Sequence, residues 1–373
     1  MSRVRDNDGM KRPRTWKLLL RIAMSGALLA LLFWQLPDFD ADKLFANWTG
    51  NAWAWLMGSG VLMLGAFGLQ TLRWHQVLLA LGLRSSMGRL FSYFMAGQFV
   101  SNILPTTIGG DVVRILRLAK DNDDPPASFA SVVLERLTGW FVLPMISLLG
   151  FLLNPSLLRL GAASWTAVAI CGGTLLALTA ILAIASHPGW GPRLSHRGGW
   201  RAFLGAVHFG VVAIRTHRSA LVSVIGVGVA FQVVLALSVW MAARALAMDS
   251  VGLTAVLAFF PAVAIAQNLP IGIGGLGVRE GALVLFLTPL GATDEQAIAL
   301  GLTFYFVTLV TSLLGGPAFV FGRQAEEQEA AVAGDVEGLA EELERRSEAP
   351  HESAAHPRPD GRDGPSGPST AYS

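Results

Sequence analysis

The sequence predicts an all-α polytopic membrane protein, and its composition and the length of its apolar runs carry that prediction. Charged residues make up 14% of the chain and hydrophobic residues 53%, with a mean hydropathy of +0.51. Soluble domains usually carry about 25% charged residues. Apolar runs of roughly 20 residues recur, and each is long enough to cross a hydrocarbon core of about 30 Å. The chain therefore holds about 7–8 transmembrane helices plus re-entrant segments, and a soluble enzyme is excluded.

The first predicted helix, about residues 18–36, follows a basic N-terminus at residues 1–17. A basic segment before an apolar one also fits a signal peptide, but Pro37 and Asp38 follow in place of a small-residue cleavage site. We therefore interpret the segment as an uncleaved membrane helix. Its basic flank favours a cytoplasmic N-terminus.

A second helix is predicted at about residues 52–72, ending at Arg73. The third segment, residues 91–108, is only moderately apolar, and basic residues flank it on both sides. Lysine and arginine favour the cytoplasm. We therefore interpret the third segment as re-entrant, entering from the cytoplasm and returning to it.

The later apolar segments predict helices at about 127–153, 163–186, 219–245 and 296–321. The loop 187–218 has five arginines and no acidic residue, so it should be cytoplasmic, with 200–215 as a candidate interfacial helix. Apolar sequence at 251–269 leads into a Gly-rich break, and a short apolar piece follows to Leu290.

The domain organisation follows from these segments. Residues 1–17 form a basic cytoplasmic N-terminus, and residues 18–322 form the transmembrane domain, with repeat halves at about 52–186 and 219–322. Residues 323–373 hold 12 of the 26 acidic residues and 5 of the 28 basic ones. So polar a tail cannot bury a core, and we expect it to be disordered and cytoplasmic. The remaining body is basic, which suits anionic lipids or reflects ordinary topology signals.

Several classes of site are unlikely on composition grounds alone. The single cysteine, Cys171, excludes a disulfide framework and a cysteine-based metal site. No P-loop is present in the sequence, which argues against direct ATP drive. We expect no metal, no cofactor, no catalytic residues and no nucleic-acid partner.

The most informative feature is an internal repeat. Residues 105–114 and 270–279 both read P-x-x-I-G-G-x-x-V-R, and an asparagine precedes each copy. Counting crossings from a cytoplasmic N-terminus, the first copy starts from the cytoplasm and the second from outside, which is an inverted repeat. A competing count lets 251–269 cross inward and 277–290 cross back. Arg279 would then be a cytoplasmic anchor, and the inverted symmetry would fail.

The chemistry of this motif suits an anionic headgroup. Proline ends a helix, and paired glycines allow close approach of the backbone. The helix that restarts presents free N–H groups, and the arginine four residues past the second glycine should lie one turn into it, where it can bind phosphate. Two facing copies would bind a phospholipid headgroup or a polyprenyl phosphate; the alternative is helix packing and topology anchoring. The candidate substrate-binding residues are Asn102, Pro105, Gly109, Gly110, Asp111, Arg114, Asn268, Pro270, Gly274, Gly275, Arg279 and Glu280.

Glu135 and Arg136 form a candidate intramembrane charge pair, about 12 Å into their helix. Charges at such depth are costly and usually face a partner or a water-filled cavity. We expect Glu135 to pair with Arg114 or Arg117, and Arg136 with Asp111. Glu280 is expected to be the partner of Arg279 or a proton-linked carboxylate. Structural and functional roles remain open for all of these.

Three segments carry a resemblance to a known family: residues 97–114, Glu135-Arg136 followed by Gly139, and residues 268–281. They resemble the signatures of the flippase-like, or lysylphosphatidylglycerol synthase transmembrane region, family, over about residues 15–322. In its bifunctional members a soluble aminoacyl-transferase domain follows the membrane region. Here a short, polar tail follows, so the resemblance implies a stand-alone member that translocates lipid and does not synthesise it.

The resemblance and the motif together predict a lipid translocase of the cytoplasmic membrane and not an enzyme. Its cargo would be an anionic or aminoacylated phospholipid, or a polyprenyl-phosphate-linked lipid. The alternative is an accessory membrane subunit for lipid glycosylation or cell-envelope synthesis, or a lipid-modifying membrane enzyme. The expected partners are membrane lipids, with a homodimer or an envelope-synthesis protein as further options.

Overall fold

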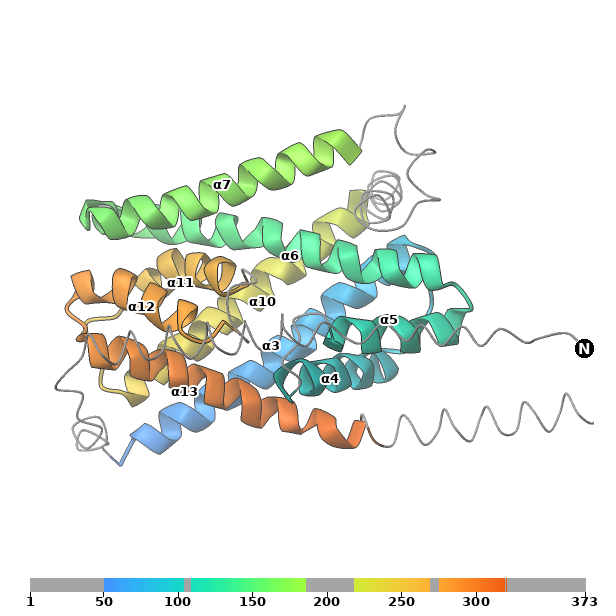
Figure 1. Ribbon diagram of the computed structural model, residues 1–373, viewed down its shortest axis with the longest axis horizontal. Helices are drawn as coiled ribbons and strands as arrows, with labels where there is room; N and C mark the ends of the chain where they lie inside the picture. Colours follow the sequence, from blue (N-terminus) through green and yellow to red (C-terminus); the bar gives the residue numbers. More distant parts are fainter. Residues whose placement is uncertain (1–49, 104–108, 186–217, 269–274, 319, 321–373) are drawn as a thin grey trace, which may run out of the picture. The chain divides into compact units, whose positions relative to one another are not determined.

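The computed structural model describes residues 50–103, 109–185, 218–268, 275–318 and 320. Within these ranges every regular element is a helix, which confirms the all-α class (Figure 1). The predicted first helix at 18–36, the candidate interfacial helix at 200–215 and the acidic tail at 323–373 lie outside the described residues.

The described helices follow the predicted order, with shifts at their ends. They are α3 (Ala52–Ala80), α4 (Met87–Ile103), α5 (Gly109–Asn122), α6 (Pro125–Leu153), η1 (Pro155–Arg159), α7 (Ala162–Ala185), α10 (Arg218–Ala245), α11 (Leu253–Gln267), α12 (Val278–Leu287), η2 (Thr288–Leu290) and α13 (Asp294–Leu313). Five of the described helices, α3, α6, α7, α10 and α13, are long and apolar enough to cross a membrane. The chain is thus a multi-pass membrane protein.

Four shorter helices form two helical hairpins. α4 and α5 make the first hairpin, and α11 and α12 make the second; they lie in opposite halves of the helical body (Figure 1). α11 has 15 residues and α12 has 10. At 1.5 Å per residue these helices are about 22 Å and 15 Å long, short of a hydrocarbon core of about 30 Å. Their lengths favour a re-entrant hairpin for residues 251–290 over two full membrane crossings.

The end of α3 differs from its prediction. The helix was predicted at about residues 52–72, ending at Arg73, but it continues to Ala80. Arg73 and Trp74 are buried, and Trp74 Nε1 donates a hydrogen bond to Ser131 Oγ at 3.1 Å. Polar side chains that contact neighbouring helices inside the protein need not end a helix. The predicted boundary was therefore wrong.

The long helices pack through small and aromatic side chains. α3 and α10 are joined by a reciprocal pair of hydrogen bonds, Ser59 Oγ to Ser238 O at 2.9 Å and Ser238 Oγ to Ser59 O at 2.8 Å. Phe259 of α11 stacks on Phe286 of α12 with ring centroids 5.4 Å apart, which closes the second hairpin. Hydrogen bonds between hydroxyl groups and close packing commonly stabilise the association of membrane helices.

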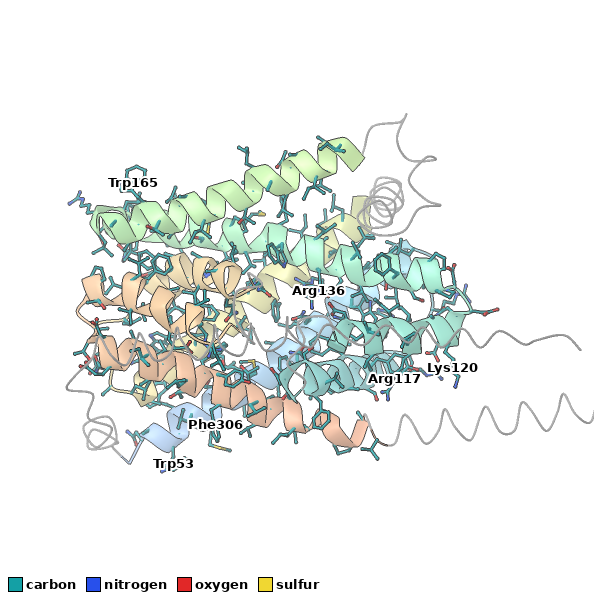
Figure 2. All side chains as sticks on the ribbon, in the orientation of Figure 1. Trp53, Arg117, Lys120, Arg136, Trp165 and Phe306 are labelled. Atoms are coloured by element: carbon teal, nitrogen blue, oxygen red, sulfur yellow. The ribbon has the colours of Figure 1, made fainter. Side chains whose placement is uncertain are left out.

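The outside of the helical body is apolar. Trp165, Trp53 and Phe306 project outward from α7, α3 and α13 (Figure 2), and each is more than half exposed. Exposed apolar surface of this extent marks contact with a membrane or another protein. The exterior therefore agrees with helices that face lipid.

Candidate functional site

The first hairpin closes on two glycines. A Cβ built on Gly97 of α4 would lie 2.8 Å from the carbonyl oxygen of Gly110 in α5. A Cβ on Gly110 would come closer still to the carbonyl oxygen of Gly97 and to Ser101 Oγ. Glycine at these two positions lets the two helices touch, and it brings the start of α5, at Gly109, against α4.

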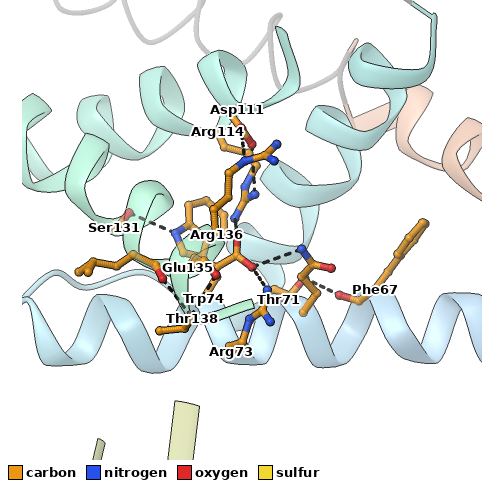
Figure 3. Close-up of polar contacts among 12 residues, drawn as sticks. Phe67, Thr71, Arg73, Trp74, Asp111, Arg114, Ser131, Glu135, Arg136 and Thr138 are labelled. Atoms are coloured by element: carbon orange, nitrogen blue, oxygen red, sulfur yellow. Dashed lines mark hydrogen bonds and ion pairs between the residues drawn. The ribbon is translucent and has the colours of Figure 1, made fainter. Parts of the chain in front are cut away.

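A buried carboxylate lies behind this hairpin. Glu135 of α6 is fully buried and forms an ion pair with Arg73 of α3 (Figure 3). Arg114 Nη2 lies 3.2 Å from Glu135 Oε2, and Gln70 Nε2 donates to Glu135 Oε1 at 3.2 Å. One carboxylate therefore ties together α3, α5 and α6, each through a charged or polar side chain.

A second carboxylate extends the network. Asp111 pairs with Arg136, and its Oδ1 also lies 3.5 Å from Arg114 Nη1 (Figure 3). The predicted pairs Glu135 with Arg114 and Arg136 with Asp111 are both confirmed. The Nη1 of the alternative partner, Arg117, donates to the carbonyl of Ala318, beyond the end of α13, at 3.1 Å.

Arg114 also rests on aromatic rings. Its guanidinium carbon lies 4.2 Å from the centroid of the Trp74 ring and 5.3 Å from that of Phe94. The hydrogen bond from Trp74 to Ser131 fixes the orientation of that ring. Attraction between a guanidinium and an aromatic face is strongest where both are desolvated. The rings thus stabilise a cation at a depth where burial would otherwise be costly.

The charges of this network do not cancel. The network consists of Arg73, Arg114, Arg136, Asp111 and Glu135, so it carries one excess positive charge. Within the described ranges, Arg73 Nε and Nη1 and Arg114 Nε have no hydrogen-bond partner. Buried polar groups are normally paired. Unpaired guanidinium N–H groups beside an excess positive charge are what an anion-binding site requires.

Both arginines around Glu135 are buried, and a Cβ on Gly97 would lie 3.1 Å from Arg114 Cγ. Arg73 is enclosed, since a Cβ on Gly139 would lie 2.9 Å from its Nη1 and a Cβ on Gly228 would lie 3.5 Å from its Cδ. Arg114 lies on the hairpin itself, which also carries Asn102 at the end of α4. The Nδ2 of Asn102 is buried and has no hydrogen-bond partner among the described residues. Pro105, the next candidate, lies outside the described residues.

The second hairpin holds a self-contained ion pair. Arg279 and Glu280 are both buried, and Arg279 Nη2 and Nε lie 2.6 Å and 3.0 Å from Glu280 Oε1. The other oxygen, Oε2, accepts from the backbone N–H of Gly277 at 2.6 Å. The partnership predicted for Glu280 is confirmed. The N-terminus of α12 thus carries the chain's own carboxylate, which accepts from the N–H of the N-cap residue, Gly277.

The two arginines of the repeat stand at different heights on their helices. Arg114 is the sixth residue of α5, as the repeat predicted. Arg279 is the second residue of α12, because that helix begins only at Val278. The expected position one turn into the helix was therefore wrong for Arg279. The shift places its guanidinium next to Glu280, and its carbon lies 5.1 Å from the centroid of the Tyr305 ring.

Two further candidates of the second copy, Gly275 and Asn268, have contacts that explain them by packing and local hydrogen bonding. Gly275 has φ of +74°, and a Cβ on it would lie 2.6 Å from Gln267 Cβ, so glycine suits both its backbone and its space. Asn268 is exposed, and its Nδ2 donates to the carbonyl of Ala264 at 2.6 Å. Pro270 and Gly274 lie outside the described residues. Substrate binding by the candidates in either copy stays a prediction.

The structure thus groups the candidates into two sets rather than one facing pair. Asp111, Arg114, Glu135 and Arg136 form one set, and Arg279 with Glu280 forms the other. Among the residues whose placement is described, no hydrogen bond or ion pair joins these sets.

Sequence reasoning missed Arg73 and Gln70, which both contact Glu135. A signal for them was present. The two polar residues are three positions apart, which places them on one face of a helix. Apolar sequence then resumes at Val77 and Leu78, so the run does not end at the arginine. A cation followed by a further apolar turn indicates burial within a helix rather than its end.

Comparison with protein-family models gives one match. The family described as lysylphosphatidylglycerol synthase TM region matches residues 18–316, a span that includes both hairpins and the whole arginine network. Comparison with curated proteins finds no match.

Proposed function

The chain belongs to the lysylphosphatidylglycerol synthase TM region family, and from that premise we propose that it is a lipid translocase of the cytoplasmic membrane. The family is named for the membrane region of a lipid-synthesising enzyme, which supports a lipid-related role. The match is to the TM region of that enzyme, which favours a path for lipid over group-transfer chemistry. We therefore propose transport rather than catalysis.

We propose that the first hairpin opens to the cytoplasm and the second to the outside. Arg84 precedes α4 and Lys120 lies in the last turn of α5, at the open end of the first hairpin. The chain on either side of the second hairpin carries Asp249 and Asp294. Excess lysine and arginine favours the cytoplasmic side. With this orientation both termini are cytoplasmic, and the halves at about 52–186 and 219–322 form an inverted repeat.

The observation that carries the proposal is the excess positive charge centred on Arg114. A buried arginine inside a membrane domain is costly and usually serves substrate or ion movement. A guanidinium binds phosphate oxygens through paired, charge-assisted hydrogen bonds. Anionic phospholipids, aminoacylated phospholipids and polyprenyl-phosphate-linked lipids all carry such a phosphate. We propose that the headgroup passes Arg114 while the acyl or prenyl chains stay in the bilayer.

A liposome assay tests the proposal. Purified protein is reconstituted with fluorescent phosphatidylglycerol or phosphatidylcholine, and dithionite reports the label in the outer leaflet. We expect wild type to accelerate exchange and Arg114→Gln to slow it by about tenfold or more, equivalent to ~1.4 kcal/mol in the barrier. Arg159→Gln removes an exposed arginine of η1 and should leave exchange unchanged.

Two results would contradict the proposal. Wild-type exchange no faster than that of empty liposomes, with each of the lipids, would favour the accessory role in envelope synthesis. An exchange rate of Arg114→Gln equal to that of wild type would contradict the assignment of Arg114 to the site, but it would not contradict translocation.

A further inference from the structure

We propose that the arginine network selects headgroups with one net negative charge, which means a phosphodiester whose remaining groups are uncharged. This inference rests on the proposed translocase function and narrows its cargo. Three arginines face two carboxylates, so one added negative charge would neutralise the network. The ion pair in the second hairpin is neutral and adds nothing to that count.

Arg114 is the arginine that can be released to a ligand. Each carboxylate has a nearer arginine of its own: Arg73 for Glu135, and Arg136 for Asp111. Arg114 is shared between the two carboxylates at the longer distances of 3.2 Å and 3.5 Å. If Arg114 turns to a phosphate, both carboxylates keep a counter-ion. The network can therefore bind an anion without leaving a buried carboxylate unpaired.

The carboxylates set the upper limit on ligand charge. Within the described network, a second negative charge on the headgroup would have no further arginine to pair with and would face Glu135 and Asp111. Like charges at close range repel strongly in a low-dielectric site. A headgroup with an added ammonium group would bring a cation into a site that is already positive. The network should therefore bind phosphate monoester lipids and aminoacylated lipids more weakly than singly charged phosphodiester lipids.

An unpaired neutral donor suits the uncharged part of such a headgroup. Asn102 Nδ2 is buried, has no partner in the described part of the chain and lies on the same hairpin as Arg114. A side-chain amide can donate to a phosphate oxygen or to a headgroup hydroxyl. It adds a hydrogen bond without changing the charge count.

The lipid arm of the test compares headgroups in one liposome preparation. The probes are phosphatidylglycerol, phosphatidylcholine, lysyl-phosphatidylglycerol and phosphatidic acid, which carry net charges of about −1, 0, +1 and −1 to −2 because a phosphate monoester has its second pKa near 6. We expect phosphatidylglycerol to exchange about tenfold faster than each of the others, equivalent to ~1.4 kcal/mol. Equal rates for the four lipids, or a faster rate for lysyl-phosphatidylglycerol, would overturn the inference.

The variant arm tests charge count separately from residue identity. Arg136→Gln cancels the excess charge and should slow phosphatidylglycerol exchange by about tenfold. Asp111→Asn/Arg136→Gln restores the excess of one and should return the rate to within about threefold of wild type. Asp111→Asn alone raises the excess to two and should favour phosphatidic acid. A double variant as slow as Arg136→Gln would overturn the charge count.

A binding measurement separates this inference from the proposed function. Thermal unfolding in detergent is followed with phosphatidylglycerol, phosphatidylcholine or inorganic phosphate, since a ligand that binds the folded state raises the midpoint. We expect stabilisation by phosphatidylglycerol alone. Selective binding of phosphatidylglycerol without lipid exchange would support the charge selectivity and contradict translocation. Lipid exchange without selective binding would support translocation and contradict the charge selectivity. Stabilisation by inorganic phosphate and not by phosphatidylglycerol would overturn the lipid assignment.

Discussion

The two hairpins share a sequence motif but balance the charge of its arginine in different ways. In the first, Arg114 of α5 reaches Glu135 of α6, which also holds Arg73 of α3. In the second, Arg279 pairs with the next residue, Glu280, and the same carboxylate accepts a hydrogen bond from the N–H of Gly277. One arginine is bound to neighbouring helices, and the other is satisfied within its own helix.

This difference assigns unequal roles to similar segments. The first hairpin is coupled to two spanning helices and carries an excess positive charge, so a ligand there can alter contacts among α3, α5 and α6. The second hairpin is neutral and has its helix end already occupied. A motif repeated in the sequence thus occurs in two hairpins, while residues outside the motif decide how the charge of its arginine is balanced.

The largest effect is expected at the carboxylates. Glu135→Ala leaves Arg73 without its counter-ion and Arg114 with Asp111 alone, and breaking a buried pair costs about 3–5 kcal/mol. Glu280→Ala removes the partner of a single buried arginine, whereas Glu135 contacts two, so it should cost less. The midpoint of thermal unfolding in detergent measures both. Asp249→Ala, which removes a partner with an 81% exposed side chain, is the control and should cost about 0–1 kcal/mol.

Equal shifts of the thermal unfolding midpoint for Glu135→Ala and Glu280→Ala would contradict the difference between the two hairpins. They would mean that the two carboxylates stabilise their surroundings to the same extent, despite the different number of arginines that they contact.

A smaller effect is expected at the glycine contact of the first hairpin. Gly110→Ala forces a methyl group onto the backbone of Gly97, and overpacking of this kind costs about 1–3 kcal/mol. Gly65→Ala in α3 has no neighbouring atom within 4 Å and should be neutral or stabilise by about 0.5–1 kcal/mol. A thermal shift in the same direction for both variants would contradict the close packing of α4 on α5.

The smallest effect, and an equal one, is expected at the caps of the helices that follow each hairpin. Asp124 Oδ1 accepts from Ala127 N at 2.9 Å at the start of α6, and Thr293 Oγ1 accepts from Gln296 N at 3.2 Å at the start of α13. Replacing either cap by alanine should cost about 1 kcal/mol. Thermal midpoints that differ widely between Asp124→Ala and Thr293→Ala would show that the two halves differ in more than charge.

The sequence predicts most of the fold because hydropathy and length determine where apolar helices lie. α6 and α7 begin and end within two residues of their predicted bounds, at Pro125–Leu153 and Ala162–Ala185. The pairs of Arg114 with Glu135 and of Arg136 with Asp111 were also predicted, since a charge at membrane depth needs a partner and few are available.

The remaining parts of the site depend on contacts that a single sequence does not encode locally. Arg73 lies where the sequence analysis ended a helix, and its partner Glu135 lies on another helix, far away in the sequence. The count of one excess charge depends on which arginines share which carboxylate. That sharing is a property of three-dimensional packing between α3, α5 and α6.

One measurement tests the central claim, that the first hairpin and not the second carries the anion site. Initial rates of phosphatidylglycerol exchange in liposomes are compared for Arg114→Gln and for Arg279→Gln/Glu280→Gln, with thermal midpoints confirming that each variant is folded. The account predicts a loss of about tenfold or more for Arg114→Gln, equivalent to ~1.4 kcal/mol, and a rate within about threefold of wild type for the double variant. Loss of exchange in the double variant with retention in Arg114→Gln would contradict it.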